Sequence, residues 1–321
     1  MMKYSEVVPV VREIIESYTI RLTVRQIFYR LISPPYQLFA GTQNNYKQFD
    51  RILTRAREKG DLDWRRIEDR ARTTLGGDYG FESPEEFINY KIKDFKNSWM
   101  FYDRRMWDEQ DCYVEIWLEK DALATLFSEV ARKYRVLVFP SRGYSSFTKI
   151  MEALTDSDRF PRYIRMGKPI VILHFSDHDP SGLNMTVDIN NRLFKRDYLV
   201  RGLAEVFSSE ELEKIKELFK GKEWLVKVER CALTYEQVRR YNLPPNPTKK
   251  ADPRSKWYVQ QYGDQCWELD AVEPSELQRI IENSTLKWIN REKWNETVKK
   301  IEGEKQKLKE KFEKAKISFE D

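Results

Sequence analysis

Two stretches of the chain decide its fold. Residues 170–182 read IVILHFSDHDPSG, and residues 113–123 read YVEIWLEKDAL. Each begins as an apolar run rich in β-forming residues, stops at carboxylates and leads into a helical pattern, as in a parallel α/β sheet. Ligands of such sheets lie in the crevice at the carboxyl ends of the strands. If the two strands are neighbours, Glu119, Asp177 and Asp179 meet at one edge of the sheet.

A cluster of three carboxylates needs a cation, because burying unpaired charges is costly. We expect Mg²⁺, since hard divalent ions prefer carboxylate oxygens, with Mn²⁺ as the alternative ion. Glu115 shares the strand and the face of Glu119 but lies deeper in the sheet. We therefore expect Glu115 either to have a structural role or to support the metal ligands without binding the ion itself.

The two histidines of the chain, His174 and His178, flank the aspartate pair. A zinc or nickel site is one interpretation of this arrangement. No third nitrogen or sulfur ligand lies near them in the sequence, which favours hydrogen-bonding or core roles. Cys112, Cys231 and Cys266 are widely spaced, form no zinc pattern and indicate a reducing interior.

The composition predicts a soluble, globular protein. The 321 residues are 40% hydrophobic and 34% charged, which allows two or three domains. No apolar stretch approaches membrane-spanning length, and the N-terminus lacks a signal-peptide pattern, so we expect a cytoplasmic protein without a membrane partner. A net charge of +5 does not by itself indicate a polyanionic partner. Local clusters of basic residues have to carry that inference.

Three helices are expected in the first sixty residues. Apolar residues at helical spacing predict a helix over 5–18. A capping box from Thr23 to Gln26 starts a second helix, which Pro34 and the proline after it end. A third helix is predicted over 44–59, with Gly60 as its C-terminal stop.

The third predicted helix has a basic face. Three helices of which the last is basic are typical of a helix-turn-helix or winged-helix module that binds DNA. A solvated helix face is the alternative interpretation. The basic residues of this helix, the candidate DNA-binding residues, are Lys47, Arg51, Arg55, Arg57 and Lys59, and those of a predicted wing after it are Arg65, Arg66, Arg70 and Arg72.

Strands and helices alternate in the middle of the chain, which predicts a mostly parallel sheet with right-handed crossovers. After Tyr235 the pattern is mainly helical, with a helix starting at Pro274 and a lysine-rich helix over 287–316. We expect the apolar stripe of this last helix to pack on the body or on a partner helix, and a DNA-binding tail is the alternative interpretation. The predicted strands cover 113–119, 135–140, 169–176 and 224–230, and the predicted helices among them cover 121–134, 145–155 and a stretch from Pro180. The predicted segments are 1–77, a connector over 78–112 with a helix near Ser83, 113–235 and 236–321.

Three motifs together resemble the A subunit of type IIB DNA topoisomerases (topoisomerase VI) and the related meiotic double-strand-break protein. They are RQIFY at 25–29, EKDA at 119–122 and DHDPSG at 177–182, and their order and separations match as well. The chain length is most similar to that of the stand-alone "mini-A" members of the group. The resemblance covers roughly residues 1–200.

The resemblance implies a fold and a reaction. It implies an N-terminal winged-helix-like (CAP-like) domain, a central Toprim domain over about 113–235 and a helical C-terminal region. It implies that Tyr29 attacks double-stranded DNA to leave a 5′-phosphotyrosyl bond, with Glu119, Asp177 and Asp179 as Mg²⁺ ligands. It also implies a homodimer with composite active sites, in which the tyrosine of one protomer meets the Toprim site of the other.

Further roles follow from chemistry. Arg25 lies one helical turn before Tyr29, so it can bind the phosphate. A phenol of pKa near 10 needs help to lose its proton at neutral pH. Glu119 either binds the metal or donates a proton to the leaving oxygen, and the sequence does not decide between these roles. Lys120 is a weaker candidate for contact with the DNA backbone.

The chain also departs from the larger enzymes. Gly143 matches the glycine that follows the second Toprim strand, but Ser145 stands where those enzymes tend to have proline. No nucleotide-binding loop of the GxxxxGK[ST] type is present, so ATP-driven strand passage would need a separate ATPase B-type subunit. From the resemblance, and without an ATP site in this chain, we expect a nucleoid-associated enzyme that nicks, breaks or relaxes DNA. The alternatives are a Toprim nuclease that uses metal-activated water and a non-catalytic DNA-binding protein.

Overall fold

The computed structural model describes residues 2–68, 80–141, 147–249 and 251–314. The protein is a mixed α/β structure, and its chain divides into two compact units. The division does not follow the predicted borders, because the connector and the last helix form one unit together. The first unit comprises Met1–Arg72 and Cys112–Trp288, and the second comprises Thr73–Asp111 and Ile289–Asp321.

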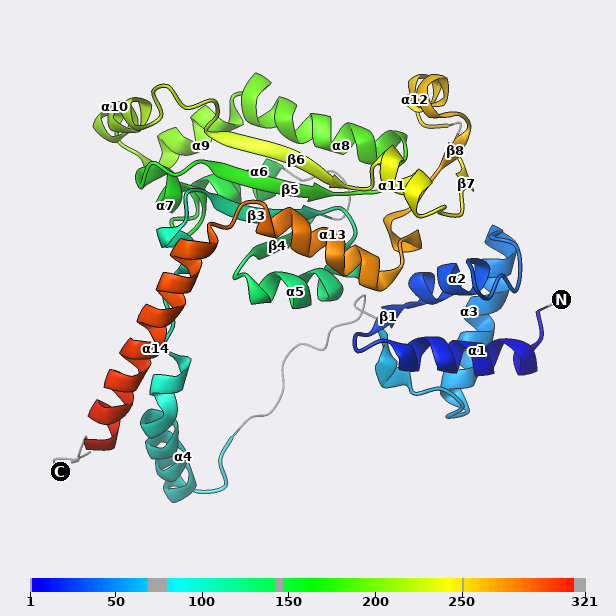
Figure 1. The fold of residues 1–321 in the computed structure, drawn as a ribbon, viewed down its shortest axis with the longest axis horizontal. Coiled ribbons are helices and arrows are strands. Elements are labelled where there is room, and N and C mark those ends of the chain that lie inside the picture. The colour runs from blue at the N-terminus through cyan, green and yellow to red at the C-terminus, as the bar shows by residue number, and fades with distance from the viewer. Residues whose placement is uncertain (1, 69–79, 142–146, 250, 315–321) are drawn as a thin grey trace. The chain divides into compact units, whose positions relative to one another are not determined.

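A four-stranded parallel sheet lies at the centre of the first unit (Figure 1). Its strands, in spatial order, are β4 (Leu137–Pro140), β3 (Tyr113–Leu118), β5 (Ile170–Phe175) and β6 (Val226–Ala232). Every residue of β3 and β5 is buried, which explains their nearly continuous apolar sequences. The predicted parallel sheet and its four strands are confirmed.

Helices cover both faces of this sheet, with α8 (Pro180–Asn190) on one face and α5 (Ala124–Lys133) and α13 (Pro274–Leu286) on the other (Figure 1). The predicted helices that follow the first and third strands are confirmed to within a few residues. Gly143 and Ser145 lie outside the described residues. The remaining elements of this region are η4 (Asp121–Leu123), α6 (Phe147–Thr155), α7 (Phe160–Arg165), the π-helical turn η5 (Asn191–Lys195), α9 (Tyr198–Val206) and α10 (Ser209–Leu218).

The three N-terminal helices are confirmed as α1 (Tyr4–Ser17), α2 (Val24–Ile32) and α3 (Gln43–Glu58). The capping box of α2 is complete, because the Thr23 side chain accepts from the Gln26 amide and the Gln26 side chain accepts from the Thr23 amide. Gly60 follows α3 with a φ of 76°, a left-handed conformation that favours glycine.

The stretch after α3 differs from a simple wing in the part that the structure describes. The short helix η1 (Trp64–Arg66) carries the exposed Arg65 and Arg66. It leads into β2 (Ile67–Glu68), which pairs in parallel with β1 (Leu22–Thr23) just before α2. The predicted wing residues Arg70 and Arg72 lie outside the described residues.

The segment between the sheet and α13 is not wholly helical. It contains α11 (Tyr235–Arg240), α12 (Ser255–Tyr262) and the short helix η6 (Leu269–Ala271). It also contains an antiparallel ribbon of two-residue strands, β7 (Asn246–Pro247) and β8 (Gln265–Cys266), which the sequence did not predict. The ribbon is tied to the end of β5, because His178 and Trp267 exchange two backbone hydrogen bonds of 2.9 and 3.0 Å.

The second unit joins the connector to the last helix. The predicted helix at Ser83 is α4 (Pro84–Asn97), followed by η2 (Ser98–Phe101) and η3 (Met106–Glu109). They pack against α14 (Arg291–Lys314), and the rings of Phe95 and Phe312 lie 4.8 Å apart. The apolar stripe of the last helix therefore packs on the connector. Every helix in the described part of the chain is too short or too polar to cross a membrane.

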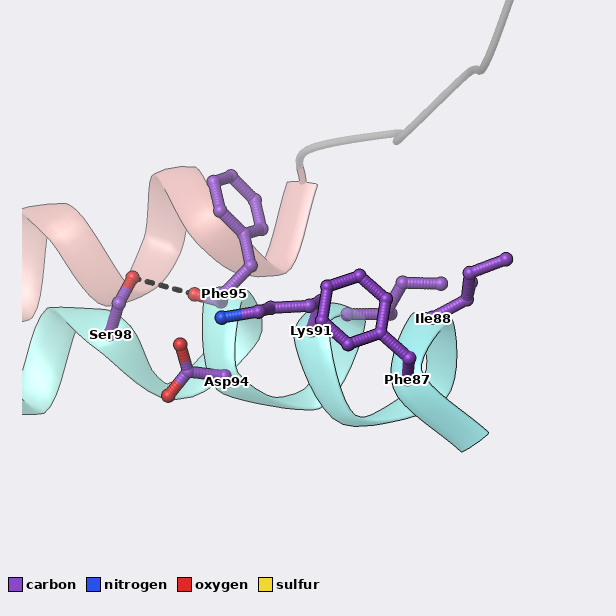
Figure 2. A pocket seen from close by; sticks show the side chains of 7 residues that line it. Phe87, Ile88, Lys91, Asp94, Phe95 and Ser98 are labelled. Atoms are coloured by element: carbon purple, nitrogen blue, oxygen red, sulfur yellow. Dashed lines mark hydrogen bonds between the residues drawn. The ribbon is translucent and has the colours of Figure 1, made fainter. Parts of the chain in front are cut away.

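A groove of about 530 Å³ runs along α4 in the second unit (Figure 2). Phe87, Ile88 and Phe95 are exposed, and Ser98 donates a hydrogen bond of 2.7 Å to the carbonyl of Phe95 at the end of the helix (Figure 2). The lining is mainly apolar and includes a single acid, Asp94.

Candidate active site

The sheet brings two of the predicted carboxylates together. Strands β3 and β5 are parallel neighbours, with Leu118 opposite Phe175, so both strands end at the same edge of the sheet. The amide of Asp177 donates a hydrogen bond of 3.2 Å to Oε2 of Glu119. The sequence-based expectation that these two acids meet is confirmed.

Asp179 has a more local role in this structure. Its Oδ1 accepts a hydrogen bond of 2.6 Å from the amide of Gly182 and so caps α8, which is the common use of an aspartate at a helix start. The turn is tight, because a Cβ on Gly182 would lie 2.2 Å from the carbonyl oxygen of Asp177. The glycine of the DHDPSG motif is therefore required by the close approach of two backbone segments.

Arg230 holds this turn from inside the protein. Its guanidinium donates to the carbonyl of Asp177 at 2.7 Å and to the carbonyl of Gly182 at 2.9 Å. It also donates to the hydroxyl of Ser176 at 2.7 Å. Burial lowers the pKa of Arg230 to about 10, although Glu119 and Asp177 oppose that shift. Arg230 thus fixes the backbone that carries the aspartates.

We call the edge of the sheet where Glu119, Asp177 and Asp179 follow β3 and β5 the acidic edge. Lys120 is the cation at its centre. Its Nζ lies 3.2 Å from Oδ1 of Asp177 and 2.9 Å from Oε2 of Glu268, and it also binds Oδ2 of Asp270. Burial alone would lower the pKa of Lys120, but Asp177, Asp270 and Glu268 raise it well above its ordinary value. Lys120 therefore stays charged and joins the end of β3 to the segment after β8.

Glu268 extends the network to the helix that carries the candidate tyrosine. Nη1 of Arg25 lies 2.6 Å from both carboxylate oxygens of Glu268. Although burial works to raise it, the pKa of Glu268 is lowered by Lys120 and Arg25. The guanidinium of Arg25 also lies 5.0 Å from the centre of the Tyr46 ring on α3. Glu268 is thus the bridge between α2 and the acidic edge of the sheet.

Tyr29 is enclosed beside this bridge. Its side chain is 4% exposed, and its hydroxyl oxygen accepts a hydrogen bond of 2.8 Å from Nδ2 of Asn246. Burial, and then the negative charge of Glu268, raise the pKa of the phenol above its ordinary value. A cavity of about 30 Å³, enough for a water molecule, adjoins Tyr29 and is lined also by Arg25, Tyr46 and Asn246.

The pKa values of two carboxyl groups at the acidic edge, those of Asp177 and Glu119, are raised. Burial raises the pKa of Asp177 to about 7, and Glu119 adds to the shift while Lys120 opposes it. Burial also raises the pKa of Glu119. A raised pKa favours the protonated form of the Glu119 carboxyl, which is the form that a proton donor needs, so both roles expected for Glu119 stay open.

The donor chemistry of the predicted ligands fits Mg²⁺. Glu119, Asp177 and Asp179 each use one carboxylate oxygen for protein donors, and among the described residues no hydrogen bond reaches the other oxygen. Such oxygens are the ligands that Mg²⁺ prefers. Within the described ranges, however, no three acidic, histidine or cysteine side chains are gathered as a metal-holding group. The three carboxylates would have to converge on an ion.

Both histidines have the hydrogen-bonding roles favoured by the sequence. Nδ1 of His174 lies 2.8 Å from the hydroxyl of Thr186, and Nδ1 of His178 lies 2.8 Å from the hydroxyl of Tyr258. Burial lowers the pKa of His174 to about 3 and that of His178 to about 4. Both rings are therefore neutral at physiological pH and serve the packing of the site.

Glu115 has the structural role predicted for it. It is fully buried and forms an ion pair with Arg159, with Nη2 2.6 Å from Oε2 and Nε 2.9 Å from Oε1. Tyr113 and Trp117 donate the remaining hydrogen bonds to its carboxylate, at 3.1 and 3.0 Å. Each carboxylate oxygen of Glu115 therefore accepts two hydrogen bonds from within the protein.

The basic residues of α3 line its outer side as predicted. Lys47, Arg51, Arg55 and Lys59 are exposed, and Arg57 is half-buried. Arg55 and Lys59 lie over the ring of Tyr4, at 5.6 and 5.2 Å from its centre. In the described part of the chain neither Lys47 nor Arg51 pairs with a carboxylate. These two cations are available to a polyanion.

The sequence did not single out Glu268, Asp270, Asn246 or Arg230. Glu268 and Asp270 form an acidic pair two residues apart after the short strand β8, which is the same kind of signal as Asp177 and Asp179. That signal is weak without the fold, because β8 is only two residues long. Nothing in the local sequence marks Asn246.

No protein-family model matches this chain, and no curated protein matches it either.

Proposed function

We propose that this chain cleaves duplex DNA by Mg²⁺-dependent tyrosine transesterification, as the A subunit of type IIB topoisomerases does. On this proposal the N-terminal helices act as a winged-helix-like module and the parallel sheet as a Toprim domain. One observation supports this reaction most directly. A network of ion pairs runs from Arg25 through Glu268 and Lys120 to Asp177, and it links the helix that carries Tyr29 to the acidic edge of the sheet.

The proposed reaction exchanges one phosphoester for another. The hydroxyl oxygen of Tyr29 bonds to phosphorus while the bond from phosphorus to the 3′ oxygen breaks. The phenol gives its proton to a water molecule, and the 3′ oxygen takes one, for which Glu119 is the candidate donor. When bound, Mg²⁺ supplies a Lewis acid that neutralises charge on the phosphate and the leaving oxygen.

Arg25 is proposed to hold the phosphate that Tyr29 attacks. It lies one turn before Tyr29 on α2, and its guanidinium now binds Glu268 at 2.6 Å. Phosphate and carboxylate compete for the same guanidinium geometry. We therefore expect the phosphate of entering DNA to replace Glu268 on Arg25. Tyr29 is almost fully enclosed, so DNA has to displace neighbouring groups to reach it.

The proposed partners are duplex DNA, a second copy of the chain and a separate ATPase subunit. The exposed basic residues of α3, with Lys47 and Arg51 foremost, are proposed to bind phosphates along the duplex. Two sites in a homodimer would give a staggered double-strand break. The contacts from Arg25 to Asp177 lie within one protomer, so on this proposal each site is formed by a single chain and not between two protomers as the resemblance implies. Strand passage would need a separate ATPase subunit.

The decisive experiment uses supercoiled plasmid. The protein is incubated with plasmid and Mg²⁺, then denatured with and without protease before electrophoresis. We expect 5′ ends that carry protein and that disappear in Tyr29→Phe. Free ends with Tyr29→Phe still active would instead indicate a nuclease that uses metal-activated water. Binding without cleavage under any divalent metal would indicate a non-catalytic DNA-binding protein.

A further inference from the structure

Asn246 makes the hydrogen bond that the structure gives to the hydroxyl oxygen of Tyr29. The two residues are 217 positions apart in the chain, and the distance from Nδ2 to Oη is 2.8 Å. Asn246 lies on β7, outside the three sequence motifs. A donor placed on the reacting atom of a candidate nucleophile calls for a functional explanation.

The ribbon that carries Asn246 is fixed to the acidic edge. Asn246 pairs with Cys266 on β8. Trp267, which follows Cys266, exchanges two backbone hydrogen bonds with His178, one from each amide to the other residue's carbonyl. Two residues further, the amide of Leu269 donates a hydrogen bond of 2.7 Å to Oδ1 of Asp177. The same short segment therefore sets the position of Asn246 and of the aspartate end of β5.

Several charged or titratable groups surround the phenol of Tyr29. They are Arg25 on its own helix, Tyr46 on α3, Lys120 after β3 and Glu268 after β8. Burial and Glu268 oppose ionisation of the phenol, whereas Asn246, Lys120 and Arg25 favour it. Of these groups, Asn246 is the one bonded to the oxygen itself.

A donor at this place does two things. It stabilises a phenolate more than a phenol, because hydrogen bonds to charged oxygen are the stronger ones. It also leaves the hydroxyl proton to point elsewhere, and the small cavity beside Tyr29 offers room for a water to receive it. Both effects prepare the oxygen for attack on phosphorus.

We propose that Asn246 is a positioning residue for the Tyr29 nucleophile, which it holds in place while favouring loss of the phenolic proton. The inference rests on the proposed tyrosine chemistry. It adds a residue from the segment after the sheet to a site otherwise defined by α2, β3 and β5.

The test compares two substitutions of Asn246. Asn246→Asp keeps the size of the side chain but replaces the donor by an acceptor, and Asn246→Ala removes both. We expect the rate of covalent protein–DNA complex formation at saturating DNA to fall about tenfold to a hundredfold in Asn246→Ala, the effect of one hydrogen bond to a charged group. The fall should be larger in Asn246→Asp, with little change in the half-saturating DNA concentration in either variant.

A pH profile separates this role from simple packing. In both variants the rising limb of rate against pH should move to higher pH, because the phenol ionises less readily. Gln265→Ala is the matched control, since Gln265 is exposed on the facing strand and opposite Pro247. Its rate, pH profile and melting temperature should equal those of the wild type.

A second readout follows the phenol directly. With 3,5-difluorotyrosine at position 29, the ring titrates nearer neutral pH and can be followed by fluorine NMR in the full chain. We expect Asn246→Ala to raise the midpoint of that titration by about one pH unit. An active wild type whose rate, pH profile and titration are unchanged in Asn246→Asp would overturn this inference alone. A wild type that forms no protein–DNA link would remove the proposed function and this role together.

Discussion

The interior of strand β3 and its carboxyl end use their glutamates in opposite ways. In the interior of β3, Glu115 receives four hydrogen bonds from Arg159, Tyr113 and Trp117. At the end of that strand, Glu119 receives a single hydrogen bond from the part of the chain that the structure describes, and the amide of Asp177 donates it. The two acids are four residues apart and have the same chemistry.

The difference shows what separates a structural carboxylate from a reactive one. An acid whose oxygens are all satisfied by fixed donors has nothing left for a ligand, and removing it leaves its partners unpaired. An acid with an open oxygen and a raised pKa is costly to the fold but ready for a metal ion or a proton. The sheet interior therefore serves stability, and the edge carries the open carboxylate oxygens that the proposed reaction needs.

The largest expected effect lies at the edge. Asp177→Asn or Glu119→Gln should lower DNA cleavage by at least about a thousandfold, because each removes a charge that the proposed site needs. Affinity for DNA, measured by fluorescence anisotropy, should stay close to that of the wild type. Full cleavage in either variant would remove the carboxylates from the mechanism.

In the interior, Glu115→Gln should cost stability instead. Breaking a buried ion pair leaves Arg159 uncompensated, and we expect the free energy of unfolding to fall by about 3 to 5 kcal/mol. Urea unfolding followed by circular dichroism measures this change. Glu119→Gln is the matched control, and equal losses in the two variants would erase the distinction between interior and edge.

A smaller effect is expected from acid. The folded-state pKa of His174 is lowered from 6.5 to about 3, so the unfolded chain binds more protons between those values. Stability is therefore present above pH 6.5 and declines as the pH falls, by about 2 kcal/mol at pH 5 from this residue. His174→Gln, which can still bond to Thr186, should flatten the decline in urea unfolding measured from pH 7 to 5. A decline just as steep in that variant would assign it to other groups.

The smallest effect concerns the basic face of α3. Lys47→Ala and Arg51→Ala should each weaken DNA binding by less than about tenfold and lower the salt dependence of affinity by about one unit of slope. Cleavage at saturating DNA should not change, in contrast to the edge variants. Asn44→Ala, an exposed uncharged position on the same helix, is the control. An unchanged salt slope would mean that α3 does not touch the phosphates.

Much of the fold was predictable because its signals are local. The capping box from Thr23 to Gln26 and the glycine stop after α3 were read from short patterns, and both are present. The apolar runs of β3 and β5 predicted buried parallel strands for the same reason. The ribbon of β7 and β8 was missed, because two-residue strands carry no periodic pattern.

The sequence by itself determined the parallel sheet, the three N-terminal helices and the meeting of Glu119 with Asp177. These features follow from apolar periodicity and from the rule that parallel strands end at one edge. Only the tertiary structure decided that Lys120 sits among Asp177, Glu268 and Asp270, and that Asn246 bonds to Tyr29. Those contacts join residues more than fifty positions apart, and their partners are chosen by how the ribbon after the sheet folds back on its acidic edge.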